Sequence, residues 1–271
     1  MRGNAHVRFG GRAGETERSR DRHRAPVRPY YVKVRESGRV VNMAALVAIG
    51  VSMTGERRVL GLDLAPGHSE GGAWPGFIRS LVERGLSGVG LVISDAHPGL
   101  VAAVGAQLLG AAWQRCRVHF TRNAQDLVPR RARTIVATFI RSIFDQPDEA
   151  AARAQLRLAI DGLAPRFPQV AELLAEAEAD LLVHFTFPAP HRTRIRSTNP
   201  LERLNKEIKR RSAVVGIFPN RASLIRLVGM VLAEQDDEWQ DGRCYFRPES
   251  MALITAEAEP EEEAPALLMA S

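Results

Sequence analysis

Residues 30–64 read YYVKVRESGRVVNMAALVAIGVSMTGERRVLGLDL, and this stretch decides the fold. It contains three runs rich in apolar and β-branched residues, at Tyr30 to Arg35, Arg39 to Met53 and Arg57 to Leu64. The short segments between the runs, Glu36-Ser37-Gly38 and Thr54-Gly55-Glu56, have the composition of tight turns. The stretch therefore predicts a three-stranded antiparallel meander.

The next hundred residues alternate between helical and strand patterns. Gly72 to Arg84 has apolar residues at helical spacing and is followed by Gly85, a common helix stop. Val89 to Ser94 reads as a buried strand, Pro98 to Leu109 as a helix and Trp113 to His119 as another strand. The predicted order β-β-β-α-β-α-β is that of an α/β fold with a mixed sheet.

The chain then changes to an all-helical pattern. From residue 121 to about 182 apolar residues recur every three or four positions, which predicts several helices in a unit of their own. Further helices are expected from Asn199 to Arg211 and from Ala222 to Trp239. We therefore divide the chain into an Arg/Gly-rich arm expected to be disordered, a first α/β part, a helical insertion, a last α/β part and an acidic tail also expected to be disordered, at 1–28, 29–120, 121–190, 191–245 and 246–271.

The composition fits a protein with a large core. The 271 residues are 45% hydrophobic with only two cysteines, and the longest apolar stretch, Val40 to Val51, is too short to span a membrane. With no signal sequence visible, we expect a protein of a reducing cytoplasm. The formal net charge is +6. It is concentrated in a short segment whose eight bases predict a polyanionic partner: Arg192, Arg194, Arg196, Arg203, Lys206, Lys209, Arg210 and Arg211.

Two carboxylates stand out as candidates for catalysis. Asp95 follows directly after the predicted strand Val89 to Ser94, at the sheet edge where sites of α/β folds gather, although an aspartate there can equally cap the next helix. Glu202 lies in the first turn of the helix that opens at Asn199, among bases. Its alternative role is the third position of a capping box with Asn199 as N-cap. If the two carboxylates meet, they can bind Mg²⁺ or Mn²⁺ beside bases that hold phosphates.

Cys116 and His119 are spaced as half of a zinc site, but Cys244 has no second histidine at a matching interval. We expect Cys116 and His119 to lie at the end of a strand beside Asp95 and to shape that site.

Several motifs together carry a resemblance to a known family. They are Tyr31–Arg35, Leu60–Asp63, Trp74–Leu86, Val92–His97, Gln114–Phe120 and Thr198–Arg211. In this order and spacing they resemble the Mutator-like transposases of bacterial insertion sequences. The resemblance implies a ribonuclease H-like catalytic domain interrupted by a helical insertion. It also implies an Asp-Asp-Glu triad that uses two Mg²⁺ or Mn²⁺ ions to cut DNA at element ends and join it to target DNA.

The resemblance assigns the second aspartate to Asp95, the glutamate to Glu202 and the Cys-x-x-His signature to Cys116 and His119. The first aspartate of the family falls on Arg28, and a lost carboxylate predicts impaired catalysis. Asp63 does not replace it, because the family pattern already has an aspartate there, on a strand expected at the far edge of the sheet. We interpret the chain as an amino-terminally truncated or frameshifted copy.

Two alternatives stay open. The chain can be a non-catalytic DNA-binding protein that modulates intact transposase copies, or its basic face can be ordinary solvated surface. We expect as partners the insertion-sequence ends, target DNA and further copies of the chain, with association to the nucleoid.

Overall fold

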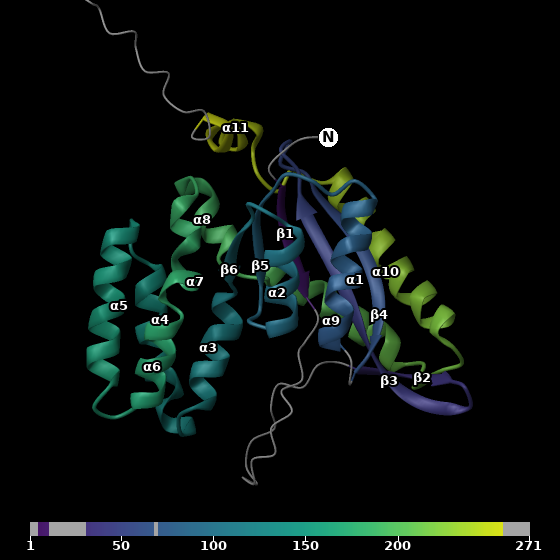
Figure 1. Ribbon diagram of the computed structural model, residues 1–271, viewed down its shortest axis with the longest axis horizontal. Coiled ribbons are helices and arrows are strands. Elements are labelled where there is room, and N and C mark those ends of the chain that lie inside the picture. Colours follow the sequence, from purple (N-terminus) through teal and green to yellow (C-terminus); the bar gives the residue numbers. More distant parts are fainter. Residues whose placement is uncertain (1–4, 11–30, 68–69, 257–271) are drawn as a thin grey trace, which may run out of the picture.

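The computed structural model describes residues 5–10, 31–67 and 70–256, which form a mixed α/β fold (Figure 1). In these ranges seven strands build one sheet in the order β6-β5-β1-β3-β2-β7, with β4 paired to β3 off this path. The strands are β1 (Ala5–Gly10), β2 (Tyr31–Glu36), β3 (Arg39–Val51), β4 (Arg57–Pro66), β5 (Val89–Ser94), β6 (Ala112–Arg115) and β7 (Ile217–Phe218). The sheet is mixed, because β5 runs parallel to β1 and β6 whereas β3 is antiparallel to β1, β2 and β4.

The predicted meander is confirmed as β2, β3 and β4. Strand β3 is its centre and pairs along one edge with β4, from Met43 to Val51. Its other edge is shared, since Arg39 to Ala44 pair with β2 and Val47 to Val51 pair with β1. Strands β1 and β2 therefore lie in line, one after the other, along the same edge of β3.

Strand β1 corrects the expectation that residues 1–28 are disordered. Ala5–Gly10 lies between β3 and β5, while the remainder of that arm lies outside the described residues. The segment AHVRFG alternates apolar and polar residues, which is a strand pattern we overlooked because it is so short. Strands β3 and β5, whose facing edges would otherwise lack partners, pair with it on its two sides.

The helices of the described ranges are α1 (Glu70–Glu83), α2 (Pro98–Gln107), α3 (Arg117–Asp126), α4 (Arg133–Phe144), α5 (Glu149–Leu163), α6 (Pro168–Glu176), α7 (Glu178–Leu182), α8 (Ala189–Ile195), α9 (Asn199–Ala213), α10 (Arg221–Asp241) and α11 (Pro248–Ala256), with short 3-10 turns η1 (Arg130–Ala132) and η2 (Val183–Thr186). None of them combines the length and apolar character needed to cross a membrane.

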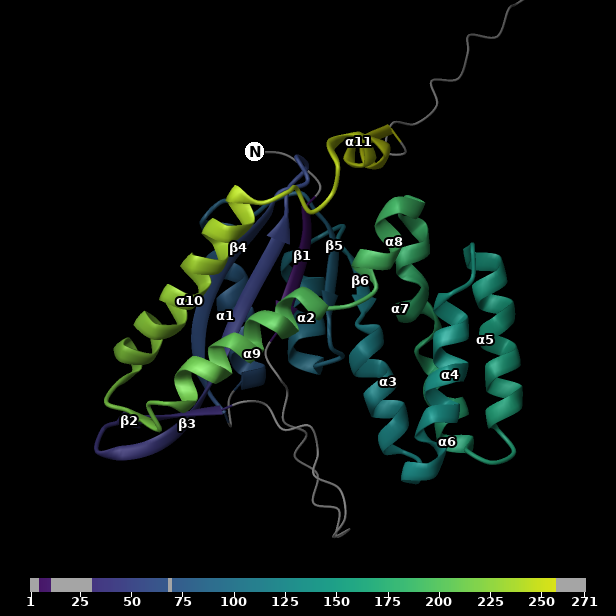
Figure 2. The same cartoon turned by 180° about the vertical axis from the view of Figure 1, so that it is seen from behind.

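Helices cover both faces of the sheet because side chains of β3 alternate between them. Leu46 and Ala48 pack with Trp74 and Phe77 of α1, which are buried core residues, and with α2. Val47 and its neighbour Ile49 belong to the opposite core cluster, with α9 and α10 (Figures 1 and 2). We call the sheet with these four helices the sheet body.

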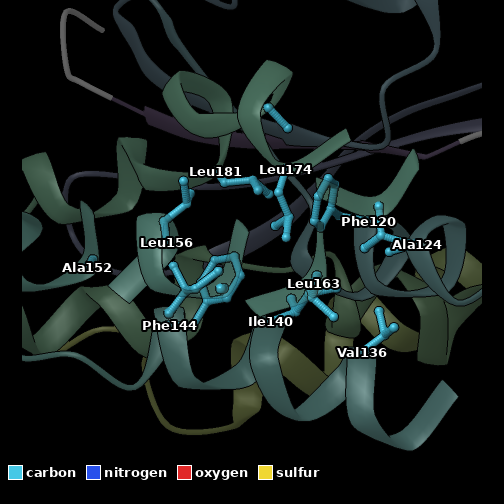
Figure 3. Close-up of a cluster of buried hydrophobic side chains, with 14 of the residues drawn as sticks. Phe120, Ala124, Val136, Ile140, Phe144, Ala152, Leu156, Leu163, Leu174 and Leu181 are labelled. Atoms are coloured by element: carbon cyan, nitrogen blue, oxygen red, sulfur yellow. The ribbon is translucent and has the colours of Figure 1, made fainter. Parts of the chain in front are cut away.

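Helices α3 to α7 lie beside the sheet and enclose a core of their own (Figure 3). We call them, with η1 and η2, the helical body. Its buried side chains all come from residues 120–185, among them Phe120, Leu156 and Leu181.

The structure also corrects the expected disorder of residues 246–271 for Pro248–Ala256, which forms α11. Met251 and Ile254 of this helix are buried with Phe246 and with Ile195 of α8. Their spacing of three residues places both on one face of a helix, so burying them stabilises it. Residues 257–271 lie outside the described ranges.

Candidate active site and basic surface

Asp95 follows the last residue of β5 and is half-buried. The next helix, α2, takes its N-cap from His97, whose Nδ1 accepts a hydrogen bond from the Leu100 N–H at 3.3 Å. Asp95 is therefore not the N-cap of α2, and its carboxylate lies at the carboxyl end of a buried parallel strand. This is the position in which α/β folds place site residues.

Glu202 lies in the first turn of α9 and its carboxylate turns toward α3. Arg122 donates to both of its oxygens, from Nη1 to Oε1 at 3.0 Å and from Nη2 to Oε2 at 3.2 Å. His119 Nε2 lies 3.4 Å from Oε1. The capping-box interpretation is wrong, because the N-cap is Thr198 and not Asn199, and the carboxylate is used by Arg122.

Cys116 and His119 do not lie on a strand. Strand β6 ends at Arg115, Cys116 is the buried N-cap of α3, and His119 lies in the first turn of that helix. The predicted strand Trp113 to His119 is thus two elements, because the Cys116 carbonyl begins the helical hydrogen bonding by accepting from the Phe120 N–H at 3.0 Å. Apolar alternation alone did not reveal this change.

Cys116 joins the beginnings of α3 and α9. Its Sγ accepts a hydrogen bond from the Thr198 N–H at 3.3 Å and lies 3.2 Å from Thr198 Oγ1. Burial opposes ionisation of the thiol, but the neighbouring His119 and Thr198 outweigh it and lower the pKa of Cys116. The pKa of His119 is raised, because Cys116, Asp95 and Glu202 together outweigh the cost of burying its charge.

His119 lies beside Glu202 and three residues after Cys116, and the charge of Asp95 also acts on it. The structure therefore places the four residues in one region, at the end of β5, the start of α3 and the start of α9. These segments are far apart in sequence and meet where the sheet body contacts the helical body (Figure 2).

Two arginines that sequence reasoning missed belong to the same site. Arg122 follows His119 by three residues and so shares its face of α3, a spacing that could have revealed it. Arg115 pairs with Ser94 in the β5–β6 ladder, next to Asp95. Burial lowers the pKa of its guanidinium, against the opposing charges of Asp180, Asp95 and Glu176. Positive groups therefore surround both carboxylates.

The residues present do not fit a two-metal centre. Mg²⁺ and Mn²⁺ need several oxygen ligands, and both oxygens of Glu202 are already bound to Arg122. Within the described ranges, no three His, Cys, Asp or Glu side chains are grouped so that they could hold a metal ion. Asp63 lies on β4 and is bound by Arg221 at 2.8 Å, so it takes no part, while Arg28 lies outside the described residues.

The eight predicted DNA-binding bases do not form one surface. Arg192 donates to the Phe187 carbonyl at 2.8 Å, Arg196 donates to the Phe144 carbonyl at 2.7 Å, and Arg194 lies over the Tyr245 ring. These three side chains, on or just after α8, hold neighbouring segments of the protein together. Arg192 and Arg196 are therefore poorly suited to contact an external phosphate, whereas Arg194 is exposed.

The five bases of α9 form two groups, of which one binds Glu207 and the other does not. Arg210 and Arg211 both bind Glu207, and these hydrogen bonds lower the pKa of Glu207 to about 2. Arg211 also binds Glu234 of α10. The remaining bases, Arg203, Lys206 and Lys209, are exposed on the helix that carries Glu202. They are the best candidates for phosphate contacts.

Comparison with known proteins identifies what the chain is similar to. The model of a family described as "Transposase, Mutator family" matches residues 27–242. The transposase for insertion sequence element IS1081 of Mycobacterium tuberculosis is 49% identical over 236 residues, which are 86% of this chain and 57% of the relative. The transposase for IS406 of Burkholderia multivorans is 46% identical over 80% of this chain and 56% of the relative. The transposase for IS256 in transposon Tn4001 of Staphylococcus aureus is 39% identical over 77% and 54%. The chain thus spans just over half the length of these relatives.

Proposed function

Because this chain belongs to the Mutator family of transposases, we propose that it is a DNA-binding member in which cleavage and strand transfer are impaired. In this proposal the sheet body is a ribonuclease H-like catalytic domain, and Asp95 and Glu202 are the remaining members of an Asp-Asp-Glu triad. The mixed sheet, with Asp95 at the end of a strand parallel to its neighbours, supports this interpretation.

The observation that carries the proposed impairment is the bidentate contact between Arg122 and Glu202. The guanidinium satisfies both carboxylate oxygens, and the two side chains are only partly exposed. A bound Mg²⁺ or Mn²⁺ would supply activation of an attacking hydroxyl and stabilisation of the leaving oxygen. To bind here, it would have to share the Glu202 carboxylate with Arg122 and the site with Arg115 and His119.

A cleavage assay tests this proposal. Labelled DNA carrying an insertion-sequence end is incubated with the full chain and Mg²⁺ or Mn²⁺, with Asp95→Ala as the control. We expect no metal-dependent nicking above the level of the control. Robust nicking that disappears in Asp95→Ala would contradict the impairment.

DNA binding is proposed to use the exposed bases of α9. Each Lys or Arg that contacts a phosphate releases about one counterion, so it adds about one unit to the slope of log affinity against log salt. Replacing Arg203, Lys206 and Lys209 with alanine is expected to reduce that slope by about 2 to 3 units.

The matched control removes the same charge from a different surface. Arg130, Arg131 and Arg166 are exposed on the helical body, and their triple alanine variant has the same net charge as the α9 variant. Equal loss of DNA affinity in both variants would mean that only net charge matters and would refute a binding face on α9. Such binding without cleavage would let the chain compete with intact transposase copies for DNA.

A further inference from the structure

Strand β1 occupies a position in the sheet that the pattern of β2 assigns to other residues. In the β2–β3 ladder Tyr31 lies opposite Ala44, so a strand continued backward from Tyr31 by three residues would place residue 28 opposite Val47. In the structure the residue opposite Val47 is Gly10, at the end of β1. Both strands run antiparallel to β3, so Gly10 stands at the register position of residue 28.

The pairing of β1 with its other neighbour, β5, relates Gly10 to Asp95. Strands β1 and β5 are parallel, and Arg8 lies beside Ile93. The pairing of β1 with β5 ends at Arg8 and Ile93, and continuing this register by two residues would bring Gly10 beside Asp95, the residue that follows β5. Because residues two apart on a strand share a face, the continued register would place positions 10 and 95 on the same side of the sheet.

Strand β1 also holds the sheet together. Among the described strands, β5 and β6 connect by backbone hydrogen bonds to the other strands only through β1. Ala5–Gly10 nevertheless lies outside the match to the family, which begins at residue 27. A central strand of the sheet is therefore built from residues that precede the part of the chain matched by the family model.

We propose that Ala5–Gly10 is a substitute strand that completes the sheet and places Gly10 where the family has its first aspartate. The segment AHVRFG contains no acidic residue, so the sheet closes without the carboxylate that would stand beside Asp95. A carboxylate at residue 10 would create a cation site with Asp95 for Mg²⁺ or Mn²⁺, which bind one or two carboxylates plus water. This inference rests on the proposed function, because the role of Asp95 is part of it.

The first experiment tests whether β1 belongs to the sheet. Val7 lies opposite Gly50 of β3 and beside Val92 of β5, so proline there removes a ladder hydrogen bond from a strand paired on both sides. We expect Val7→Pro to lower the melting temperature of the full chain by roughly 5 to 10 °C, or to prevent folding. The control, Glu149→Pro, places proline at the first position of α5, where it is tolerated because the helix does not use the N–H of that residue. Equal melting temperatures for Val7→Pro and Glu149→Pro would overturn the proposal.

The second experiment tests the position of Gly10 through Mn²⁺ binding, measured by the loss of the free-ion electron paramagnetic resonance signal. Gly10→Asp is expected to bind Mn²⁺ about tenfold or more tightly than Gly10→Asn, which has the same shape without the charge. Adding Asp95→Asn to Gly10→Asp should abolish the gain.

The outcomes separate this inference from the proposed function. A folded Gly10→Asp variant without the gain, or a gain that survives Asp95→Asn, would overturn the register assignment. Metal-dependent cleavage by the unsubstituted chain would instead overturn the proposed impairment.

Discussion

The helical body and the sheet body differ in how far apart along the chain their core residues lie. The core of the helical body is drawn from residues 120–185 alone, whereas one cluster of the sheet body contains both Val32 and Val231. A core built from neighbouring segments needs only short loops to close, and its helices can be recognised from the spacing of their apolar residues. The sheet needs contacts across nearly the whole chain. The helical body is therefore the part best suited to fold as a unit, and the sheet body is the part that depends on β1.

Polar contacts help to join the two bodies where they meet. Gln114 of β6 is buried, donates to the Leu181 carbonyl at 3.0 Å and accepts from the His184 N–H at 2.7 Å. Arg122 and Glu202 form a second contact, between α3 and α9. The candidate active site lies at this junction, so the coupling between the bodies can be measured at the residues that build the site.

The largest expected effect comes from the core of the helical body. Leu156 of α5 is fully buried, and Leu156→Ala should lower the free energy of unfolding by about 2 to 5 kcal/mol. Leu158 on the same helix is 62% exposed, so Leu158→Ala should change it by less than about 0.5 kcal/mol. Hydrogen exchange should show the loss of protection in α4 to α7 first. Equal loss in β3 and β5 would show that the two bodies unfold together.

The next effect is pH-dependent and arises at the junction. Burial, with Arg196, Arg192 and Arg117 nearby, lowers the pKa of His184 to about 4, while the Leu181 carbonyl opposes the shift. The unfolded chain binds a proton near pH 6.5, so stability is highest above that pH and falls as the pH drops toward 4. The contribution is up to about 3 kcal/mol.

Chemical denaturation between pH 7 and pH 4 measures this dependence. His184→Gln should have a flatter profile than the unsubstituted chain. Some slope should remain, because burial and Arg194 also lower the pKa of His191. An unchanged profile would mean that His184 is not the residue responsible.

A somewhat smaller effect is expected when the junction loses its buried amide. Gln114→Leu leaves the His184 N–H and the Leu181 carbonyl without their partner, which should cost about 2 kcal/mol. Gln107→Leu is the matched control, since Gln107 donates only one hydrogen bond, to the Pro75 carbonyl at 3.0 Å. If both variants lose the same stability, Gln114 does not couple the bodies.

The same contrast explains what could be predicted from the sequence. The meander and the helices of both bodies follow from periods of two and 3.6 residues, and Asp95 and Glu202 were identified from their positions near element ends. Strand β1 was missed because six residues give too little periodicity, and its stability comes from edges supplied by distant strands. The role of Arg122 was missed because its partner lies 80 residues away, and sequence spacing reveals only local pairs.

The smallest expected effect on stability concerns the pair that joins the bodies at the site. The Arg122 side chain is 35% exposed, so Arg122→Ala should reduce stability by only about 1 kcal/mol. Its effect on the site should be larger than its effect on the fold, because Glu202 loses its bidentate partner and keeps His119, whose Nε2 lies 3.4 Å from Oε1. Arg122→Ala should therefore bind Mn²⁺ more tightly than the unsubstituted chain, as measured by paramagnetic resonance.

The control is Arg133→Ala, which breaks a similarly exposed ion pair with Asp126 on the helical body. It should bind Mn²⁺ no more tightly than the unsubstituted chain. If the Arg122 variant behaves like this control, the guanidinium does not keep cations from Glu202, and the impaired site must be explained by the missing carboxylate alone.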